Sequence, residues 1–401
     1  MSTQKNYLSG REIKAIARAN AKEMKRLEAY KHRKAPESEF VSAMADDKNI
    51  LEIEDLHTFF YTEQGVVKAV NGVSYSVPKN SVVGVVGESG CGKSVTSMSV
   101  MRLIQGPTGQ IVDGSIRFKS YDFKRDEKGN PVPKADGAGE YEMEEKVYDI
   151  AKMPIHEIHR IRGKQVAMIF QEPMTSLNPV FTIGQQLDEV TLLHQPGATK
   201  AIAKAKSEDM LRLVGIIPEN VYNAFPHELS GGMRQRVMIA MALAAEPRLI
   251  IADEPTTALD VTIQAQILDL LQDIKNKIDG SILLITHDLG VIAEMADYVV
   301  VMYAGKVIEK GTVYEIFQDP RHPYTIGLQK SKPTMALDDS TELYNIPGNV
   351  PNPINMPNHC YFKERCAMCT GKCSGDYPGM VQVSPTHYVA CHLYGKEADN
   401  D

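Results

Sequence analysis

Three short motifs in a fixed order constrain this chain more than any other feature. The first is a glycine-rich loop at residues 87–94, GESGCGKS, and the second is LSGGMRQR at residues 229–236. The third is LIIADE at residues 249–254, in which an apolar run ends in two carboxylates. The glycine-rich loop alone predicts nucleoside triphosphate binding. The three motifs in this order predict that two such chains close around ATP.

Size and composition indicate a globular chain with two or three domains. The 401 residues can bury a substantial core, and 24% charged with 43% hydrophobic residues are ordinary values. The formal net charge of -7 gives no general reason to expect nucleic-acid binding. No apolar run approaches the roughly 18 residues that span a bilayer, and the N-terminus lacks the apolar core of a secretory signal. We therefore expect a cytoplasmic protein that needs a partner for any role at a membrane.

The N-terminal section, residues 1–47, contains a basic amphipathic helix whose apolar positions recur with helical spacing. Those positions are Ile13, Ile16, Ala17, Ala21, Met24 and Leu27. One interpretation is a solvated helix that packs lightly on its own domain. The other is a surface that touches a partner or anionic lipid.

The second section, residues 48–315, alternates short apolar segments with helical ones, which predicts an α/β fold with a mostly parallel sheet. The expected strands are Leu51–Phe60, Val66–Val77, Ser81–Val86, Val166–Phe170, Leu249–Ala252 and Ser281–Thr286, with a helix at Ser94–Ile104. The helix-rich stretch at about 172–248 is expected to form a helical subdomain. The charged stretch at about 120–152, with its Gly and Pro residues, is expected to be a surface insertion without chemistry.

The glycine-rich loop lies between an expected strand and an expected helix, which is the context that this motif requires. Its glycines allow backbone N–H groups to surround phosphate oxygens, and the helix N-terminus adds partial positive charge. Lys93 is expected to reach the outer phosphates, and the Ser94 hydroxyl to bind Mg²⁺. The expected nucleotide contacts are Gly87, Glu88, Ser89, Gly90, Cys91, Gly92, Lys93, Ser94 and Val95.

Two adjacent carboxylates follow the apolar strand at 249–252. Asp253 is expected at the carboxyl edge of the sheet, where it would bind Mg²⁺. Glu254 is the better candidate to orient and polarise the attacking water, the alternative being a simple ion pair with a nearby cation. Gln171 and His287 follow two further strands. Gln171 is a candidate for Mg²⁺ or the attacking water, and His287 for the γ-phosphate.

A helix start within the helix-rich stretch suits an anion. Ser230, Gly231 and Gly232 offer exposed N–H donors and one hydroxyl there. The alternative is a simple N-cap. Two glycines exceed what a cap needs, and Met233 leaves the capping box incomplete.

Together these motifs resemble the ATPase subunit of ABC transporters, over roughly residues 50–315. By that resemblance the motifs correspond, in chain order, to Walker A (87–94), the Q-loop (Gln171), the signature (229–235), Walker B (249–254), the D-loop (Ala258-Leu259-Asp260) and the switch histidine (His287). Phe60 is similar to the aromatic residue that stacks on adenine. The implied catalytic residues are Lys93, Gln171, Glu254 and His287, and the implied Mg²⁺ ligands are Ser94, Gln171 and Asp253.

The resemblance implies a P-loop ATPase core, with a mixed sheet and flanking helices, plus a helical subdomain. It also implies a head-to-tail pair of cassettes. Walker A of one subunit and Ser230-Gly231-Gly232 of the other then enclose each ATP, with Asp260 among the nucleotide-binding residues. Closure on ATP and reopening after hydrolysis drive the membrane subunits between inward- and outward-facing states.

The third section, residues 316–401, is similar to the tail of oligopeptide/dipeptide importer ATPases. The likeness rests on HPYT at 322–325, IPG at 346–348 and VP at 350–351. Five of the six cysteines also lie in this section. In a reducing compartment such clustering favours a metal over disulfides.

The cysteine spacing extends the same resemblance. In that family the pattern is C-x5-C-x6-C-x17-C, and Cys360, Cys366, Cys373 and Cys391 match it. The resemblance implies a [4Fe–4S] cluster on these four thiolates, whereas thiolate chemistry alone equally allows Zn²⁺ or free thiols. Cys369 lies outside the pattern.

The implied function is ATP hydrolysis that energises import of oligopeptides or dipeptides, performed at the cytoplasmic face of the cell membrane. The implied partners are a second, similar ATPase in a heterodimer, two membrane-spanning subunits and an extracytoplasmic peptide-binding protein, with no nucleic acid. Residues from Met174 to Thr182, with the helical region that follows, are the expected dock for a membrane subunit.

Three alternatives remain open at this point. An importer of nickel or another small solute would carry the same motifs. A soluble ABC-type ATPase usually has two cassettes or a very long coiled-coil insertion, and this sequence has neither. A regulatory module whose cysteine tail senses redox state would not need Glu254 and His287.

Overall fold

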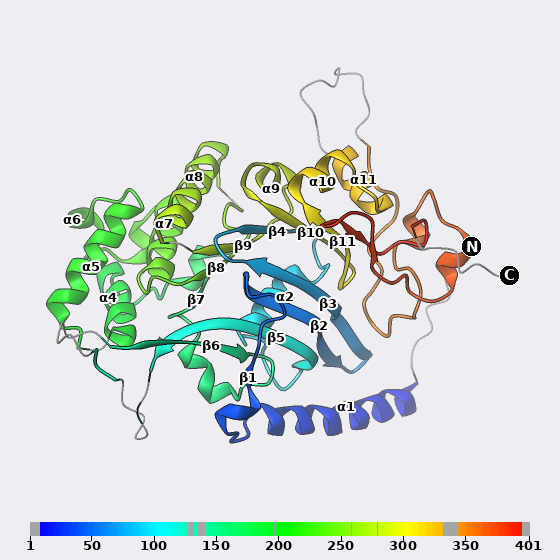
Figure 1. The fold of residues 1–401 in the computed structure, drawn as a ribbon, viewed down its shortest axis with the longest axis horizontal. Helices are drawn as coiled ribbons and strands as arrows, with labels where there is room; N and C mark the ends of the chain where they lie inside the picture. Colours follow the sequence, from blue (N-terminus) through cyan, green and yellow to red (C-terminus); the bar gives the residue numbers. More distant parts are fainter. Residues whose placement is uncertain are drawn as a thin grey trace, which may run out of the picture.

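Two β-sheets and a set of helices build the molecule (Figure 1). The computed structural model describes residues 9–124, 126, 132–134, 141–195, 197–257, 259–278, 280–331 and 344–394. The smaller sheet has the strand order β1-β6-β5-β2-β3, and the larger has the order β12-β13-β11-β10-β4-β9-β8-β7. One apolar core lies between the sheets, and a second lies between the larger sheet and its helices.

The smaller sheet is antiparallel throughout. Its strands are β1 (Val41–Ser42), β2 (Asn49–Thr62), β3 (Gly65–Pro78), β5 (Gly109–Phe123) and β6 (Met143–Asp149). The two strands predicted here lie within β2 and β3 and are confirmed. Strand β6 falls within the stretch expected to be a surface insertion, and it buries Tyr148 against Phe40. Charged residues on its outer positions hide this strand from an apolar pattern.

The larger sheet is mixed. Its strands are β4 (Val82–Val86), β7 (Val166–Ile169), β8 (Leu249–Asp253), β9 (Ser281–Ile285), β10 (Tyr298–Tyr303), β11 (Lys306–Thr312), β12 (Val381–Gln382) and β13 (Tyr388–Val389). Strands β7, β8, β9, β4 and β10 are parallel, and β11, β13 and β12 continue the sheet in antiparallel pairing. In β4, Val82 and Val86 face the helices, whereas Val83 and Val85 face the smaller sheet. Burial on both faces explains why these strands are continuous apolar runs.

The helices after α2 gather on the outer face and at one end of the larger sheet (Figure 1). They are α3 (Pro173–Ser176), α4 (Ile183–His194), α5 (Lys200–Leu213), α6 (Pro218–Val221), α7 (Gly231–Leu243), α8 (Val261–Ile278), α9 (Leu289–Met295), α10 (Val313–Gln318) and α11 (Pro323–Lys330). Helix α2 (Lys93–Val100) instead contacts β2, β3 and β8. Helices α3 to α7 form one group, in which α4 and α5 pack together. Thr182 begins α4 with a capping box, which defines its first turn.

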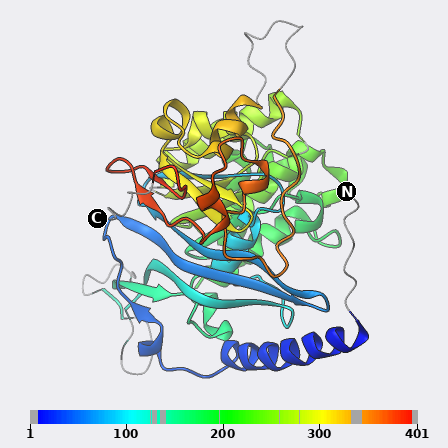
Figure 2. The ribbon, with the colours of Figure 1, turned by 90° about the vertical axis from the view of Figure 1, so that its right-hand side faces the viewer.

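Helix α1 (Gly10–Lys31) lies along the smaller sheet, across β2 and β5 (Figures 1 and 2). Leu27 of the predicted apolar stripe is buried. Two polar contacts fasten the helix. Asn20 Nδ2 donates to the Thr62 carbonyl at 2.8 Å, and Glu28 accepts from Gln110 Nε2 at 2.6 Å. The helix therefore packs on its own chain, while its basic side chains face outward.

The described C-terminal residues, 344–394, pack beside β3, β10 and β11 (Figure 2). Most of this segment is irregular, with short turns at Lys363–Arg365 and Gly371–Ser374. Its strands β12 and β13 extend the edge of the larger sheet. Every helix in the described ranges is too short or too polar to span a membrane.

Candidate nucleotide site

The phosphate loop, residues 87–94, joins β4 to α2 at the carboxyl edge of the larger sheet. Gly92 has a φ of +100°, and a Cβ added there would lie 2.3 Å from the Ala69 carbonyl oxygen. Gly87 has a φ of +152°, and its added Cβ would lie 2.2 Å from the Met302 carbonyl oxygen. The backbone passes so close to its neighbours that only glycine fits at either position. These two contacts shape the loop.

Lys93 lies inside the loop. Its ammonium group donates to the Gly87 carbonyl at 2.7 Å and to the Glu88 carbonyl at 3.2 Å. The Cys91 carbonyl accepts from Gly305 N at 2.9 Å, and burial raises the pKa of the Cys91 thiol. Burial varies along the loop: Gly87, Cys91, Gly92 and Lys93 are buried, Glu88, Ser94 and Val95 half-buried, and Ser89 and Gly90 exposed. The exposed tip leaves room for a ligand above the loop.

Ser94 and Asp253 lie side by side beneath the loop. The Ser94 hydroxyl donates to Asp253 Oδ1 at 3.0 Å, and Asp253 is 5% exposed at the end of β8. Burial raises the pKa of Asp253 to about 6; the Glu254 carboxylate also raises it, whereas Ser94 and Lys93 lower it. A buried carboxylate beside a hydroxyl is a donor set that suits a hard divalent cation. These two residues therefore fit Mg²⁺ by their chemistry.

Gln171 and His287, two of the predicted site residues, both approach the carboxylate of a third, Glu254. Its backbone has a φ of +46°, which is strained for a non-glycine residue, and its N–H donates to the Ile285 carbonyl at 2.8 Å. Its carboxylate oxygen Oε2 accepts from Gln171 Nε2 and from Thr257 Oγ1, both at 2.9 Å. His287 Nδ1 lies 3.4 Å from the same oxygen. The sequence reasoning missed Thr257, whose only signal is its position three residues after Glu254.

The Ser230-Gly231-Gly232 segment begins α7. Ser230 is the N-cap, and its hydroxyl accepts from Met233 N at 3.3 Å. A Cβ added to Gly231 would meet nothing within 4 Å. Ser230 and Gly231 are both exposed, so the helix N-terminus faces open space. Ser230 can therefore cap α7 while the N-terminus of the helix stays accessible to an anion.

Two further predicted residues lie elsewhere. Asp260 Oδ1 accepts from Ile263 N at 3.0 Å and so begins α8, while Ala258 of the same motif lies outside the described residues. Phe60 is half-buried in β2. A Cβ added to Gly109 would lie 2.8 Å from Phe60 Cε1, which places the ring against the start of β5.

Two residues from the C-terminal part of the chain contact the phosphate loop. Glu88 N donates to the Tyr324 hydroxyl at 2.8 Å. Arg365 Nη1 donates to Glu88 Oε2 at 2.7 Å, and Nη2 to Oε1 at 3.0 Å. Both partners were missed from the sequence. They lie 236 and 277 residues from Glu88, and no local pattern connects them.

None of the five described tail cysteines forms a disulfide. Cys360 N donates to the Cys373 carbonyl at 3.2 Å. Burial raises the pKa of Cys360 to about 11, and the thiolate charges of Cys373, Cys391 and Cys366 add to that effect. Cys369 is exposed. Within the part of the chain that the structure describes, no three His, Cys, Asp or Glu side chains gather as a metal-binding group, so the predicted cluster is not confirmed.

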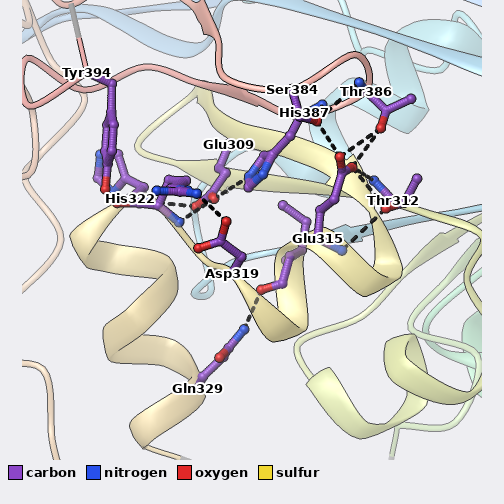
Figure 3. A network of polar contacts seen from close by, with 12 residues as sticks. Glu309, Thr312, Glu315, Asp319, His322, Gln329, Ser384, Thr386, His387 and Tyr394 are labelled. Carbon is purple, nitrogen blue, oxygen red and sulfur yellow. Dashed lines mark hydrogen bonds and ion pairs between the residues drawn. The ribbon is translucent and has the colours of Figure 1, made fainter.

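A buried polar network fastens the tail to the cassette (Figure 3). Glu309 of β11 is fully buried, and its carboxylate lies 2.7 Å from His387 Nε2 of the tail. The same carboxylate accepts from the backbone N–H groups of Arg321 and His322, at 2.6 and 2.9 Å. Burial lowers the pKa of His322 to about 4, although Glu309 opposes the shift. His322 Nδ1 is thus an acceptor, which Tyr324 N uses at 3.0 Å.

Glu315 forms the second half of this network (Figure 3). Its carboxylate accepts from the hydroxyls of Ser384, Thr386 and Thr312. Burial acts to raise its pKa, but these donors and the Thr312 N–H outweigh it and lower the pKa to about 2. Tyr394 adds a contact from its hydroxyl to the Arg321 carbonyl at 3.0 Å. The last described residues are therefore bound to the cassette through polar groups.

Comparison with known families gives two matches along the chain. The model of the ABC transporter family matches residues 70–257. The model described as the oligopeptide/dipeptide transporter C-terminal region matches residues 308–373. The first match contains the phosphate loop, the α7 N-terminus and the strand that ends at Asp253. The second contains the tail segment that bears Arg365.

Relatives of known description agree with both matches. The oligopeptide transport ATP-binding protein OppD of Bacillus subtilis is 48% identical over 350 residues, which covers 87% of this chain and 90% of that protein. The dipeptide transport ATP-binding protein DppD of the same organism is 44% identical over 354 residues, covering 88% and 97%. Among solved structures, the ATP-binding cassette MJ0796 superposes with a TM-score of 0.53 at 21% identity, covering 66% of this chain and 98% of that one.

That structural likeness bears on the fold alone, and it agrees with the predicted ATPase cassette. The sequence relatives carry the assignment further because the identity extends over almost the whole of both chains. The chain therefore belongs to the oligopeptide/dipeptide family of ABC transporter ATP-binding proteins.

Proposed function

We propose that this chain is the energy-coupling ATPase subunit of a membrane importer for oligopeptides or dipeptides. The observation that carries the proposal is the convergence of Gln171 and His287 on the Glu254 carboxylate. Glu254 is the next residue after Asp253, whose carboxylate accepts from the Ser94 hydroxyl beneath the phosphate loop. The descriptions of the relatives favour peptides over nickel or another small solute.

The loop residues would divide the work of binding. Lys93 would leave the loop carbonyls and bind the outer phosphates, which are stronger acceptors. Ser94, Asp253 and Gln171 would hold Mg²⁺, which when bound neutralises charge on the outer phosphates. The ring of Phe60 would stack on the adenine. Each role uses a group whose chemistry suits it.

Glu254 would orient the attacking water and accept its proton as the water adds to the γ-phosphorus. Gln171 and Thr257 both donate to one oxygen of this carboxylate, which fixes the orientation of the group. His287 would contact the γ-phosphate from the end of β9. Its side chain is 63% exposed, so a ligand can reach it without a rearrangement of the core.

A second cassette would complete the site. The exposed N-terminus of α7 offers N–H groups and the Ser230 hydroxyl to a phosphate. We place that segment, with Asp260, against ATP bound to the phosphate loop of the opposing subunit. The opposing subunit would be a second, homologous ATPase, in a heterodimer.

The membrane subunits would dock beside α3 and α4, with the chain lying peripherally at the cytoplasmic face. Three large apolar side chains are exposed there: Val180 at 70%, Phe181 at 49% and Leu193 at 70%. A cavity of about 440 Å³ is lined in part by Phe181 and Leu193. Exposed apolar groups beside such a cavity suit a partner helix. An extracytoplasmic binding protein would deliver the peptide.

The chain would work as three parts, namely an N-terminal extension (1–47), the ATPase domain (48–315) and a C-terminal extension (316–401). Within the last, we propose that Cys360, Cys366, Cys373 and Cys391 bind a metal centre, an iron–sulfur cluster rather than zinc. The hydrogen bond from Cys360 N to the Cys373 carbonyl, at 3.2 Å, supports the proposal because it brings two of the four cysteines together. Iron and sulfide in anaerobically purified protein would support it, and zinc alone or no metal would refute it.

Glu254→Gln tests the proposed function. The variant keeps the shape of the side chain but removes the base, so ATP turnover should fall by about 10²–10⁴-fold. The ATP-bound cassettes should remain paired in gel filtration, and peptide uptake by vesicles containing the whole transporter should stop. Glu219→Gln, on an exposed carboxylate of α6, is the control and should match the wild type. Undiminished uptake by Glu254→Gln would refute energy coupling by this chain.

A further inference from the structure

The segment from Cys360 to Cys366, here called the cysteine turn, carries both an aromatic side chain and an arginine into the cassette. Phe362 is buried, and Arg365 N donates to the Phe362 carbonyl at 2.9 Å. The first cysteine is bonded through its N–H to the Cys373 carbonyl. The path of the backbone between the two cysteines therefore determines where Arg365 lies.

Arg365 uses all of its donor groups. Beside the two bonds to Glu88, Nη1 also donates to the Tyr303 hydroxyl at 3.3 Å and Nη2 to the Ile346 carbonyl at 3.5 Å. Nε donates to the Pro347 carbonyl at 2.8 Å. The Arg365 side chain is 5% exposed, and that of Glu88 is 30% exposed. A fully bonded, bidentate guanidinium defines the position of its partner carboxylate closely.

Glu88 is bound at its backbone as well as at its side chain. Tyr324, which accepts from Glu88 N, packs 5.5 Å from the Phe362 ring. Tyr303 lies 5.3 Å from the same ring and 4.7 Å from Tyr324, measured between centroids. One aromatic cluster thus supports both contacts. A shift of the cysteine turn would move both anchors of this loop residue together.

Charge gives these contacts a consequence for nucleotide binding. The Glu88 carboxylate lies in the loop that surrounds the triphosphate, and like charges at short range repel. Arg365 offsets that negative charge while Lys93 remains available for the phosphates. Loss of Arg365 would leave the Glu88 carboxylate without its ion pair. The phosphate loop would also lose a contact that fixes its orientation.

We propose that Arg365 is a positioning residue of the nucleotide site, through which the conformation of the cysteine turn sets the affinity of the phosphate loop for ATP. The inference rests on the proposed ATPase function and does not require a metal on the cysteines. The tail is then a regulatory element of the ATPase cycle. Glu309 and Glu315 keep the remainder of the tail in place when the conformation of the cysteine turn changes.

A double-mutant cycle on the full chain tests the contact. Arg365→Ala should raise the KM for ATP about tenfold, as expected when a charge-assisted bond is lost, and change kcat less than about twofold. In a Glu88→Gln background the same change should raise KM less than about twofold, because no carboxylate is left unpaired. The KM of Arg365→Lys should lie between those of the wild type and Arg365→Ala, because lysine keeps the positive charge but cannot bind the carboxylate in a bidentate way. Lys372→Ala, on an exposed tail cation, is the matched control.

Equal increases in KM with and without the Glu88 carboxylate would overturn the proposal, as would an unchanged KM in Arg365→Ala. Thermal melting of each variant separates loss of fold from loss of affinity, and Arg365→Lys keeps the test valid if the alanine variant does not fold. Failure of the ATPase proposal itself would appear separately, as undiminished turnover in Glu254→Gln.

A second arm tests the turn. Cys366→Ser in the wild-type chain should raise the KM for ATP about threefold, which is less than the increase expected when the whole Arg365 contact is lost. In the Arg365→Ala background the same substitution should not raise the KM further. Cys369→Ser, on an exposed thiol outside the turn, should leave KM unchanged in both backgrounds. If Cys366→Ser and Cys369→Ser affect KM equally, or if the effect of Cys366→Ser persists without Arg365, the turn does not act through this arginine.

Discussion

The nucleotide edge of the larger sheet and the cysteine tail are built by opposite means. At the nucleotide edge, strands buried on both faces fix the backbone, so polar side chains such as Lys93 and Glu254 are available for chemistry. In the tail, regular structure is sparse and polar side chains fix the backbone instead, as Glu309 and His387 do. Polar side chains at the nucleotide edge thus act on a ligand, whereas polar side chains in the tail stabilise the fold. Tyr324 and Arg365 are exceptions, because both belong to the C-terminal part of the chain and contact the phosphate loop.

The largest effect is expected where the cassette backbone tolerates no side chain. Gly92→Ala would place a methyl group 2.3 Å from the Ala69 carbonyl oxygen at a φ of +100°. We expect a loss of about 3 kcal/mol or more in stability and no measurable ATP binding by calorimetry. Gly379→Ala, in the tail, is the control, since its added Cβ meets nothing within 4 Å and its φ is not positive. If both variants bind ATP alike, backbone packing does not shape the loop.

The tail should respond to acid through His322. Its pKa in the folded state is about 4, against 6.5 unfolded, so the unfolded chain binds the extra proton between these values. Stability is therefore full above pH 6.5 and is lost as pH falls toward 4, by on the order of 3 kcal/mol. Denaturant unfolding at several pH values measures this. His322→Asn keeps a cap acceptor without the titration and should flatten the curve; an equally steep curve would contradict the prediction.

The polar network should release the tail when one partner is removed. His387→Ala leaves the fully buried Glu309 with only its backbone donors, which we expect to cost about 2 kcal/mol. Limited proteolysis should then cut the segment after β12 sooner than in the wild type. His392→Ala, at an exposed contact to Asp376, should not change the rate. Equal rates for the two variants would show that apolar packing alone retains the tail.

The smallest effect concerns two neighbouring thiols. Cys373 is 7% exposed, whereas Cys369 is exposed. Cys373→Ser places a hydroxyl in a buried position and should cost about 1 kcal/mol, against almost nothing for Cys369→Ser. Thermal unfolding of both variants measures the difference. Equal costs would mean that the four-cysteine pattern has been assigned to the wrong thiols.

Much of the cassette was predictable because its information is local. The strands at 82–86, 249–253 and 281–285 are short, mostly apolar runs, and predicted site residues follow each of them at the same edge of the sheet. The apolar pattern missed β6, whose outward positions are charged. The roles assigned to Phe60, Ser230 and Asp260 remain predictions, because they concern a ligand and an opposing subunit.

The sequence by itself determined the chemistry of the phosphate loop, the carboxylate pair and the family, because each depends on residues adjacent in the chain. Only the tertiary structure decided which distant groups meet them. The contacts of Glu88 with Tyr324 and Arg365, and of Gln171 with Glu254, cross 236, 277 and 83 residues. Such pairs form only when packed sheets and a fastened tail bring their backbones together, and no local periodicity records that outcome.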